Sequence, residues 1–207
     1  NEGLSHKTIK DILIVLKMIL RFGAKNQMTE YRQIDIKFPT ERDKHSIDIL
    51  NRSHQKQIME YIRLHFTFKN LGIYICLSAG MRIGEICALT WDDLDVENGI
   101  IHVRKTIQRI YVIEEHRKYT EVILDTPKTK NSIREIPMTK NLLKMIRPIK
   151  KIVNGNFYVL TNEPKPTEPR TYRNYYKQFM QSLGLPLIKF HGLRHSFATR
   201  CIESKCD

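Results

Sequence analysis

The stretch SAGMRIGEICALTW, residues 78–91, breaks a helical pattern at a glycine and places charged side chains where the next pattern begins. Apolar residues dominate positions 69–79, which predicts a helix ending at Gly80. A second helix is expected to follow directly, with Arg82 at its start and Glu85 one turn later. The Glu85 carboxylate can hold the Arg82 guanidinium in one rotamer, although such a pair taken alone is more often a surface ion pair.

The spacing of apolar residues extends this pattern over the rest of the chain. It predicts further helices at residues 5–23, 53–66, 141–150, 171–183 and 190–202. Runs of β-branched residues predict strands at 100–103, 122–125, 133–137 and 157–160, of which 122–125 and 133–137 are expected to form a hairpin. Residues 106–121 are expected to extend a strand with a charged loop. The expected fold is therefore α+β, mostly α-helical with a small antiparallel three-stranded sheet.

A polar segment divides the sequence. Residues 26–46 are charged and lack a sustained period, which is typical of a linker between domains. We therefore expect one unit at residues 1–45 and a main domain at residues 46–207. The chain begins with Asn and stops inside a helical pattern at Asp207, so we expect it to be an excerpt.

The charge balance points to nucleic acid. Lys and Arg number 35 against 22 Asp and Glu, a formal net charge of +13, which attracts phosphate backbones or anionic membrane surfaces. No apolar run approaches the roughly 20 residues that span a bilayer, and residues 1–10 lack the apolar stretch of a secretion signal. We expect a cytoplasmic protein with no membrane partner. The cysteines show no spacing typical of a zinc site or a disulfide framework.

Two further stretches gather cationic and imidazole groups. TPKTKNSIR, residues 126–134, is the basic tip of the expected hairpin, and such a tip is usually only solvated. FHGLRHSFAT, residues 190–199, places His191, Arg194 and His195 on one helix face. Two histidines four residues apart can bind zinc, but few further ligands lie near in sequence, so a phosphate role is favoured and no metal is expected. A buried, hydrogen-bonded histidine remains the alternative for His195.

The three stretches, in this order and at these separations, resemble the sequence boxes of the tyrosine recombinase family, particularly the integrases of phages and conjugative transposons. The matching residues are GMRIGEICALTWDDLD at 80–95, PKTK at 127–130 and HGLRHSFAT at 191–199. The resemblance extends to residues 49–60, similar to the helix that opens that catalytic domain, and to residues 4–22, similar to the last helix of the core-binding domain before it. It implies that residues 1–45 are the C-terminal remnant of a helical core-binding domain plus a linker, and that residues 46–207 are a catalytic domain truncated at its C-terminus.

Carried over position by position, the resemblance makes Arg82 and Arg194 the phosphate ligands, His191 the catalytic imidazole and Lys128 the hairpin lysine. Two fixed guanidiniums can stabilise the charge that builds on a phosphate under attack without a metal. An imidazole can take the nucleophile's proton. Lys128 can protonate the departing 5′ oxygen, and Lys130 is a second candidate for that role.

Further residues match supporting or DNA-contacting positions. The resemblance places Glu85 and His195 as groups that orient their neighbours. Basic side chains on or beside the sheet and at a helix start are the expected contacts to the DNA backbone. They are Lys105, Lys128, Lys130, Arg134, Arg170 and Arg173.

The resemblance implies site-specific recombination of a mobile element through a 3′-phosphotyrosine intermediate, without a cofactor, by a tetramer on double-stranded DNA in the bacterial cytoplasm, at the nucleoid. The family's nucleophilic tyrosine follows the second arginine, whereas all nine tyrosines precede residue 191. We therefore expect this chain, as a monomer, to bind DNA without cleaving it. Topoisomerase-like nicking and closing and a noncatalytic DNA-binding module remain alternatives. A basic RNA-binding protein is disfavoured because no aromatic and basic stacking pattern is present.

Overall fold

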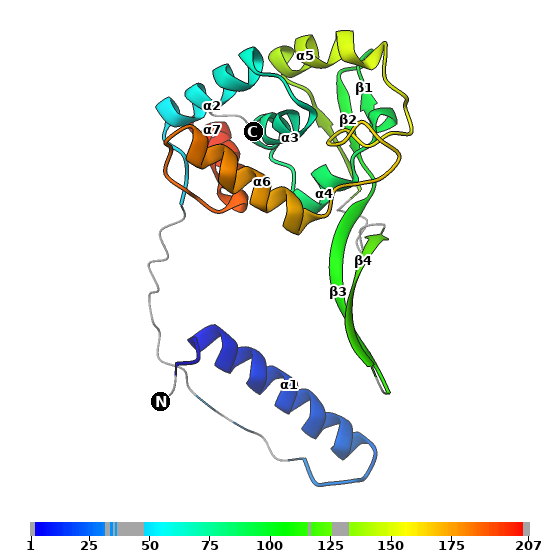
Figure 1. Ribbon diagram of the computed structural model, residues 1–207. Coiled ribbons are helices and arrows are strands. Elements are labelled where there is room, and N and C mark those ends of the chain that lie inside the picture. The colour runs from blue at the N-terminus through cyan, green and yellow to red at the C-terminus, as the bar shows by residue number, and fades with distance from the viewer. Residues whose placement is uncertain are drawn as a thin grey trace. The chain divides into compact units, whose positions relative to one another are not determined.

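The computed structural model describes residues 3–31, 34, 36, 48–115, 117–125 and 133–204 (Figure 1). The chain divides into two compact units, Asn1–His45 and Ser46–Asp207. The first unit contains α1 (His6–Lys25), which begins at Ser5, whose side chain accepts a hydrogen bond from the backbone N–H of Thr8. The helix buries none of its residues, so its apolar stripe is exposed.

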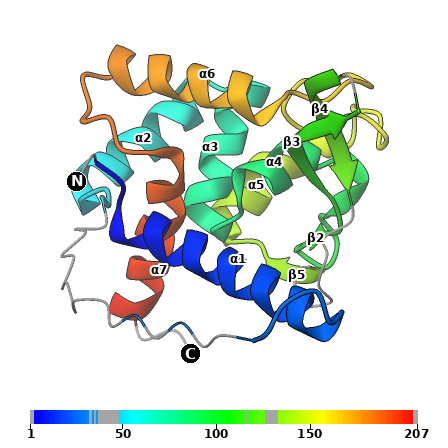
Figure 2. The ribbon, with the colours of Figure 1, turned by 90° about the horizontal axis from the view of Figure 1, so that it is seen from below.

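The second unit is built mainly of helices, and every helix expected from the apolar spacing is present. They are α2 (Arg52–Leu64), α3 (Phe68–Ala79), α4 (Ile83–Ala88), α5 (Lys140–Lys150), α6 (Pro169–Ser182) and α7 (Phe190–Glu203), with a short 3-10 helix η1 (Trp91–Asp93) after α4. Residues 70–79 of α3 are all buried, because α2, α4, α5 and α7 pack around this helix (Figure 2). No helix in the described part of the chain is long and apolar enough to cross a membrane.

One helix start differs from the sequence prediction. The sequence predicted a helix from residue 53, but α2 begins at Arg52 and is capped by Asn51, whose side-chain oxygen accepts a hydrogen bond from the His54 N–H at 2.7 Å. Asparagine is a good cap, and Asn51 lies directly before the first helical residue.

A small antiparallel sheet lies beside the helices. Its three strands run in the order β1 (Leu94–Asp95), β2 (Ile100–Val103) and β5 (Arg134–Pro137). Ile101 of β2 pairs with Ile136 of β5, and Val103 pairs with Arg134. A three-stranded antiparallel sheet in a mostly helical unit confirms the α+β prediction.

The predicted hairpin between residues 122–125 and 133–137 is wrong. Residues 122–125 belong to β4 (Arg117–Asp125), which pairs along its whole length with β3 (Thr106–Glu114), while β5 pairs with β2. The reason is that β3 pairs with β4, the strand that follows it directly in the sequence, as neighbouring strands usually do. The β3–β4 ribbon extends away from the helices of its unit (Figure 1).

The predicted strand at residues 157–160 is also wrong. Tyr158 makes only an isolated bridge with Thr90. The Tyr158 N–H donates instead to the Glu163 carbonyl at 2.9 Å, so the backbone turns and no ladder continues.

The buried Ser196 of α7 binds the segment that precedes α2. The Ser196 Oγ accepts a hydrogen bond from the Leu50 N–H at 2.8 Å and donates to the Gly192 carbonyl at 2.7 Å. A Cβ on Gly192 would lie 2.6 Å from the Asp48 carbonyl oxygen, so the helix touches this segment closely. These contacts fix the position of the helix that carries His191 and Arg194.

We expect Ser196→Ala to lower the free energy of unfolding by about 1–3 kcal/mol, because the buried Leu50 N–H loses its acceptor. Thr199→Ala is the matched control, since the Thr199 Oγ donates to the His195 carbonyl of the same helix at 2.9 Å and serves no other segment. That control should change stability by no more than about 0.5 kcal/mol. Urea unfolding followed by circular dichroism measures both, and equal losses in the two variants would contradict the role given to Ser196.

Candidate functional site

The turn between α3 and α4 depends on Gly80. Its φ is +61°, in the left-handed region, and an added Cβ would lie 2.4 Å from a ring carbon of Phe197 on α7. Only glycine fits here without strain. The chain then enters α4 with Arg82 in extended backbone directly before the helix.

The Gly80 carbonyl also receives the guanidinium of Arg194, which donates a hydrogen bond to it from α7. One glycine therefore sets the backbone that leads into Arg82 and anchors the side chain of Arg194. Residues far apart in the sequence are brought to one place by this contact.

A buried carboxylate organises the arginines. Glu85 is 3% exposed and accepts from the Arg82 backbone N–H at 2.8 Å and from the Arg82 guanidinium at 2.9 Å. The Arg134 guanidinium binds the same carboxylate with two nitrogens, at 2.9 Å to Oε1 and 2.8 Å to Oε2. Each oxygen of Glu85 thus accepts two hydrogen bonds.

Glu85 is held in its ionised form by these partners. Burial raises the pKa of the Glu85 carboxyl, but the hydrogen bonds from Arg134 and Arg82 outweigh burial, and the pKa lies below its ordinary value.

Arg194 adds a third guanidinium to this cluster. Burial, and after it the charges of Arg82 and Arg134, lower the pKa of Arg194. Arginine nevertheless remains protonated in proteins. Three guanidiniums therefore lie near one carboxylate, which only Arg82 and Arg134 bind directly, and the excess of positive charge attracts an anion.

Two imidazoles stand beside the arginines on α7. The rings of His191 and His195 meet edge to face with centroids 4.5 Å apart. Burial lowers the pKa of His191, and the neighbouring His195, Arg194 and Arg82 lower it further. His191 is therefore neutral at pH 7 and can accept a proton. Among the described residues, no group of three His, Cys, Asp or Glu side chains could hold a metal ion.

A solvent-open cleft of about 560 Å³ joins these groups to the ribbon and to α6. Its basic and imidazole side chains come from the start of α4, from β3, from α6 and from α7. They are Arg82, Arg109, Arg170, Arg173 and His191. The Arg109 guanidinium is held by Glu168, with contacts of 2.7 and 2.9 Å. The cleft can hold a phosphate group between its cationic walls.

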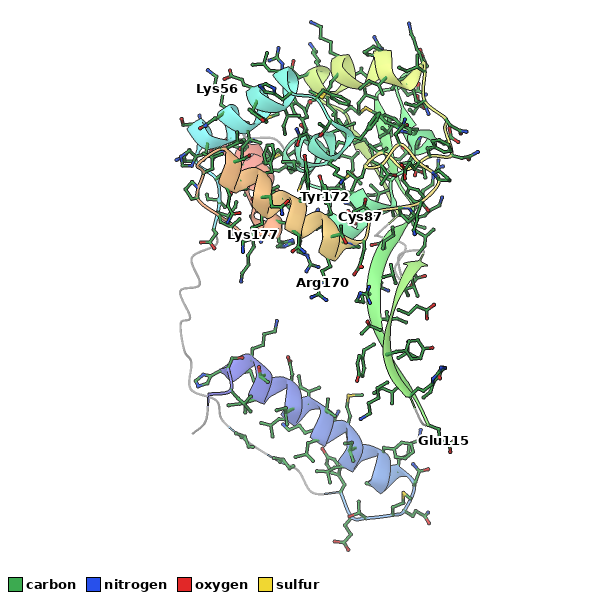
Figure 3. The ribbon with its side chains drawn as sticks, in the orientation of Figure 1. Lys56, Cys87, Glu115, Arg170, Tyr172 and Lys177 are labelled. Atoms are coloured by element: carbon green, nitrogen blue, oxygen red, sulfur yellow. The ribbon has the colours of Figure 1, made fainter. Side chains whose placement is uncertain are left out.

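The helix α6 presents a basic face and an apolar face. Arg170, Arg173 and Lys177 are exposed, and Figure 3 shows Arg170 and Lys177 projecting from the same side of the helix. Tyr172 points inward and donates from its hydroxyl to the Lys69 carbonyl at 2.7 Å (Figure 3). Spacing of 3, 4 and 7 residues makes such a stripe on a helix.

The tyrosines of α6 serve packing and hydrogen bonds within the unit. Tyr172 and Tyr176 are buried, and burial raises the pKa of both hydroxyls. The Tyr175 hydroxyl donates to the Asn70 side chain at 2.6 Å. In the described part of the chain, none of the residues that line the cleft is a tyrosine.

The structure brings together most of the residues predicted from sequence. Arg82, Glu85, His191, Arg194 and His195 form one cluster, while Arg170 and Arg173 line the cleft. Lys105 is exposed just before β3 and is not part of the cleft lining. Lys128 and Lys130 lie outside the described residues.

Sequence reasoning missed two residues. Lys177 could have been found, because it follows Arg173 by one helical turn on the polar face of α6. Arg109 gave no such signal, since its place in the cleft depends on the pairing of β3 and on Glu168, which lies far away in the sequence.

Comparison with known proteins agrees with this arrangement. The sequence model of the Phage integrase family matches residues 48–207. A tyrosine recombinase XerC-like protein of Caldanaerobacter subterraneus is 30% identical over 98% of this chain and 57% of its own length. The ICEBs1 integrase of Bacillus subtilis is 24% identical over 99% of this chain and 56% of its own length. The chain thus spans about half the length of these curated relatives.

Solved structures share the fold. The Tn1549 transposon integrase, in complex with transposon right end DNA, superposes with a TM-score of 0.76 at 22% identity, covering 100% of this chain and 70% of that one. The XerH site-specific recombinase, in a post-cleavage complex with its difH substrate, gives 0.66 at 19% identity, covering 100% and 57%. Because the family model matches most of the sequence and the solved folds agree, the chain belongs to the phage integrase family, the family of the tyrosine recombinases.

Proposed function

We propose that the protein is part of a site-specific recombinase that integrates a mobile element, and that the cleft binds a backbone phosphate of double-stranded DNA. The observation that carries this proposal is the cluster of Arg82, Arg194 and His191 around the buried Glu85, at a cleft open to solvent. The relatives named as integrases support it. We place its action in the bacterial cytoplasm, at the nucleoid.

In the proposed reaction, Arg82 and Arg194 donate to the nonbridging oxygens, where negative charge grows as phosphorus is attacked. The neutral imidazole of His191 takes the nucleophile's proton or donates to a phosphate oxygen. Lys128 protonates the departing 5′ oxygen, with Lys130 as the alternative. His195 orients His191, to which its ring is adjacent.

The covalent step is the attack of a tyrosine hydroxyl on phosphorus. A bond forms between the tyrosine oxygen and phosphorus, and the bond from phosphorus to the 5′ oxygen breaks. The product is a 3′-phosphotyrosine and a free 5′ hydroxyl, and the step needs neither a metal nor a nucleotide. The described tyrosines of α6 are unsuited to this role because they are buried or hydrogen-bonded.

The proposed DNA contacts extend from the cleft to the surface around it. Arg170 and Arg173 line the cleft, and Lys177 on the exposed face of α6, together with Lys105, is proposed to contact the backbone beyond it. The unit at residues 1–45 is proposed to be the end of a core-binding domain. A lambda integrase is known as a tetramer bound to a Holliday junction, and we propose the same assembly for the intact protein, with the present chain a monomer.

Arg82→Ala and Arg194→Ala are each expected to weaken binding to a labelled DNA duplex by about 10- to 150-fold, since a charge-assisted hydrogen bond contributes roughly 1.5–3 kcal/mol. The slope of log affinity against log salt should fall by roughly 0.9 for each. Arg147→Ala is the control, because Arg147 is exposed on α5 outside the cleft. Fluorescence anisotropy over a salt series measures the effect, and unchanged binding in both Arg82→Ala and Arg194→Ala would refute the phosphate site.

The pKa of His191 is expected to rise when DNA binds. In the free chain, burial and neighbouring positive charges hold this pKa below its ordinary value. A phosphate in the cleft adds negative charge, which favours the protonated imidazole and therefore raises the pKa. A pH titration of the histidine carbon-bound proton signals by NMR, with His191→Gln for assignment, measures it. A pKa that falls or stays constant on adding the duplex would contradict phosphate binding beside His191.

The chain of residues 1–207 is expected to form no covalent bond with DNA, because no described tyrosine lines the cleft. Incubation with a nicked suicide substrate, followed by denaturing electrophoresis, provides the test. A longer form of the protein that supplies a tyrosine to the cleft should give an adduct. An adduct on the present chain would overturn the expectation, and its absence from every longer form would favour a noncatalytic DNA-binding module.

A further inference from the structure

We propose that Arg134 is a positioning residue, which fixes the Arg82 guanidinium by holding the Glu85 carboxylate from the opposite side. The inference deepens the proposed function, since it rests on Arg82 as a phosphate ligand. Sequence analysis had placed Arg134 among the contacts to the DNA backbone. The geometry points instead to an indirect role, in which Arg134 acts on Arg82 through the Glu85 carboxylate.

The Glu85 carboxylate is held from two sides. The Arg134 guanidinium donates two parallel bonds to it, at 2.9 and 2.8 Å. From the other side, the Arg82 backbone N–H donates at 2.8 Å and one Arg82 guanidinium nitrogen at 2.9 Å. Two parallel bonds from one planar guanidinium fix the plane of a carboxylate. Arg134 therefore helps to hold the Glu85 oxygen to which the Arg82 guanidinium donates.

Exposure separates the two roles. The Arg82 side chain is 54% exposed and lines the cleft, whereas the Arg134 side chain is 25% exposed and is not part of the cleft lining. Arg82 is thus the member of the pair that an incoming phosphate reaches. Arg134 lies between the sheet and the carboxylate.

The backbone of Arg134 is held in a strand, which suits a positioning role. Arg134 begins β5, and its backbone is paired with Val103 of β2 in the three-stranded sheet. A side chain that starts from a paired strand is placed more precisely than one on a loop. The contact to Glu85 also joins this sheet to α4, across 49 residues of sequence.

Replacing Arg134 with lysine tests this role, because lysine keeps the positive charge but cannot form the two parallel bonds to Glu85. Arg134→Lys should therefore loosen Arg82 while leaving the net charge unchanged. If Arg134 acted only as a positive charge near DNA, the lysine variant would bind DNA like the wild type.

The first measurement uses the chain without DNA. NMR relaxation of the Arg82 side-chain Nε–H, assigned with Arg82→Lys, reports the motion of the guanidinium. Arg134→Lys should lower its order parameter, and Arg147→Lys, on the exposed face of α5, should not. An unchanged order parameter in Arg134→Lys overturns the proposal.

The second measurement is a double-mutant cycle of duplex affinity with Arg82→Ala, Arg134→Lys and the double variant. Arg134→Lys should weaken binding several-fold in the wild type and by less than about twofold once Arg82 is absent, because its effect passes through Arg82. Equal losses in both backgrounds would show a direct or merely structural effect and would refute the positioning role.

The two measurements separate the possible failures. If Arg82→Ala binds DNA as the wild type does, the proposed function fails, and the Arg82 order parameter alone still decides the positioning role. Should Arg134→Lys not fold, the variant with both Glu85→Gln and Arg134→Gln removes the buried charge on both sides. The Arg82 order parameter must then fall in that variant, and an unchanged value would overturn the proposal.

Discussion

The arrangement of the site depends on one buried negative charge. A carboxylate that is 3% exposed is costly unless every oxygen is satisfied, and Glu85 meets this requirement with two arginines and a backbone N–H. The requirement links α4 to β5 and prevents either element from moving alone. It also lets like-charged guanidiniums lie close together, since the carboxylate screens them from one another. A surplus of positive charge is left at the cleft, where a phosphate can complete the balance.

The backbone at Gly80 also positions the arginines of the site. Gly80 is the point where α3 ends, where the chain turns toward Arg82 and where the Arg194 guanidinium is received. The ring of Phe197 fills the space that a side chain at this position would need. Precision therefore comes from close packing of α3 against α7 as much as from the charged groups. This is consistent with a site whose cations must be fixed before substrate arrives.

The sequence predicted the features that depend on neighbouring residues, such as the positions of the helices. The apolar spacing located the helices, and the sequence boxes around Arg82 and Arg194 located the cluster. Predictions of strand pairing were wrong, because residues 122–125 carry the same β-branched signal whichever partner they have. The link from Arg134 to Glu85 was out of reach for the same reason, since no local pattern reports which carboxylate a distant strand will meet. Lys128 and Lys130 lie outside the described residues, so their roles stay predictions.

The contact of Arg194 with the Gly80 carbonyl spans 114 residues, and that of Ser196 with Leu50 spans 146. Such long-range contacts require both segments to have been synthesised, and closing so long a loop costs conformational entropy. During synthesis on the ribosome, α3 and α4 emerge long before α7, so a nascent chain carries Arg82 without its partner guanidinium. The complete cluster of guanidiniums therefore cannot exist before α7 has been synthesised and has packed against α3.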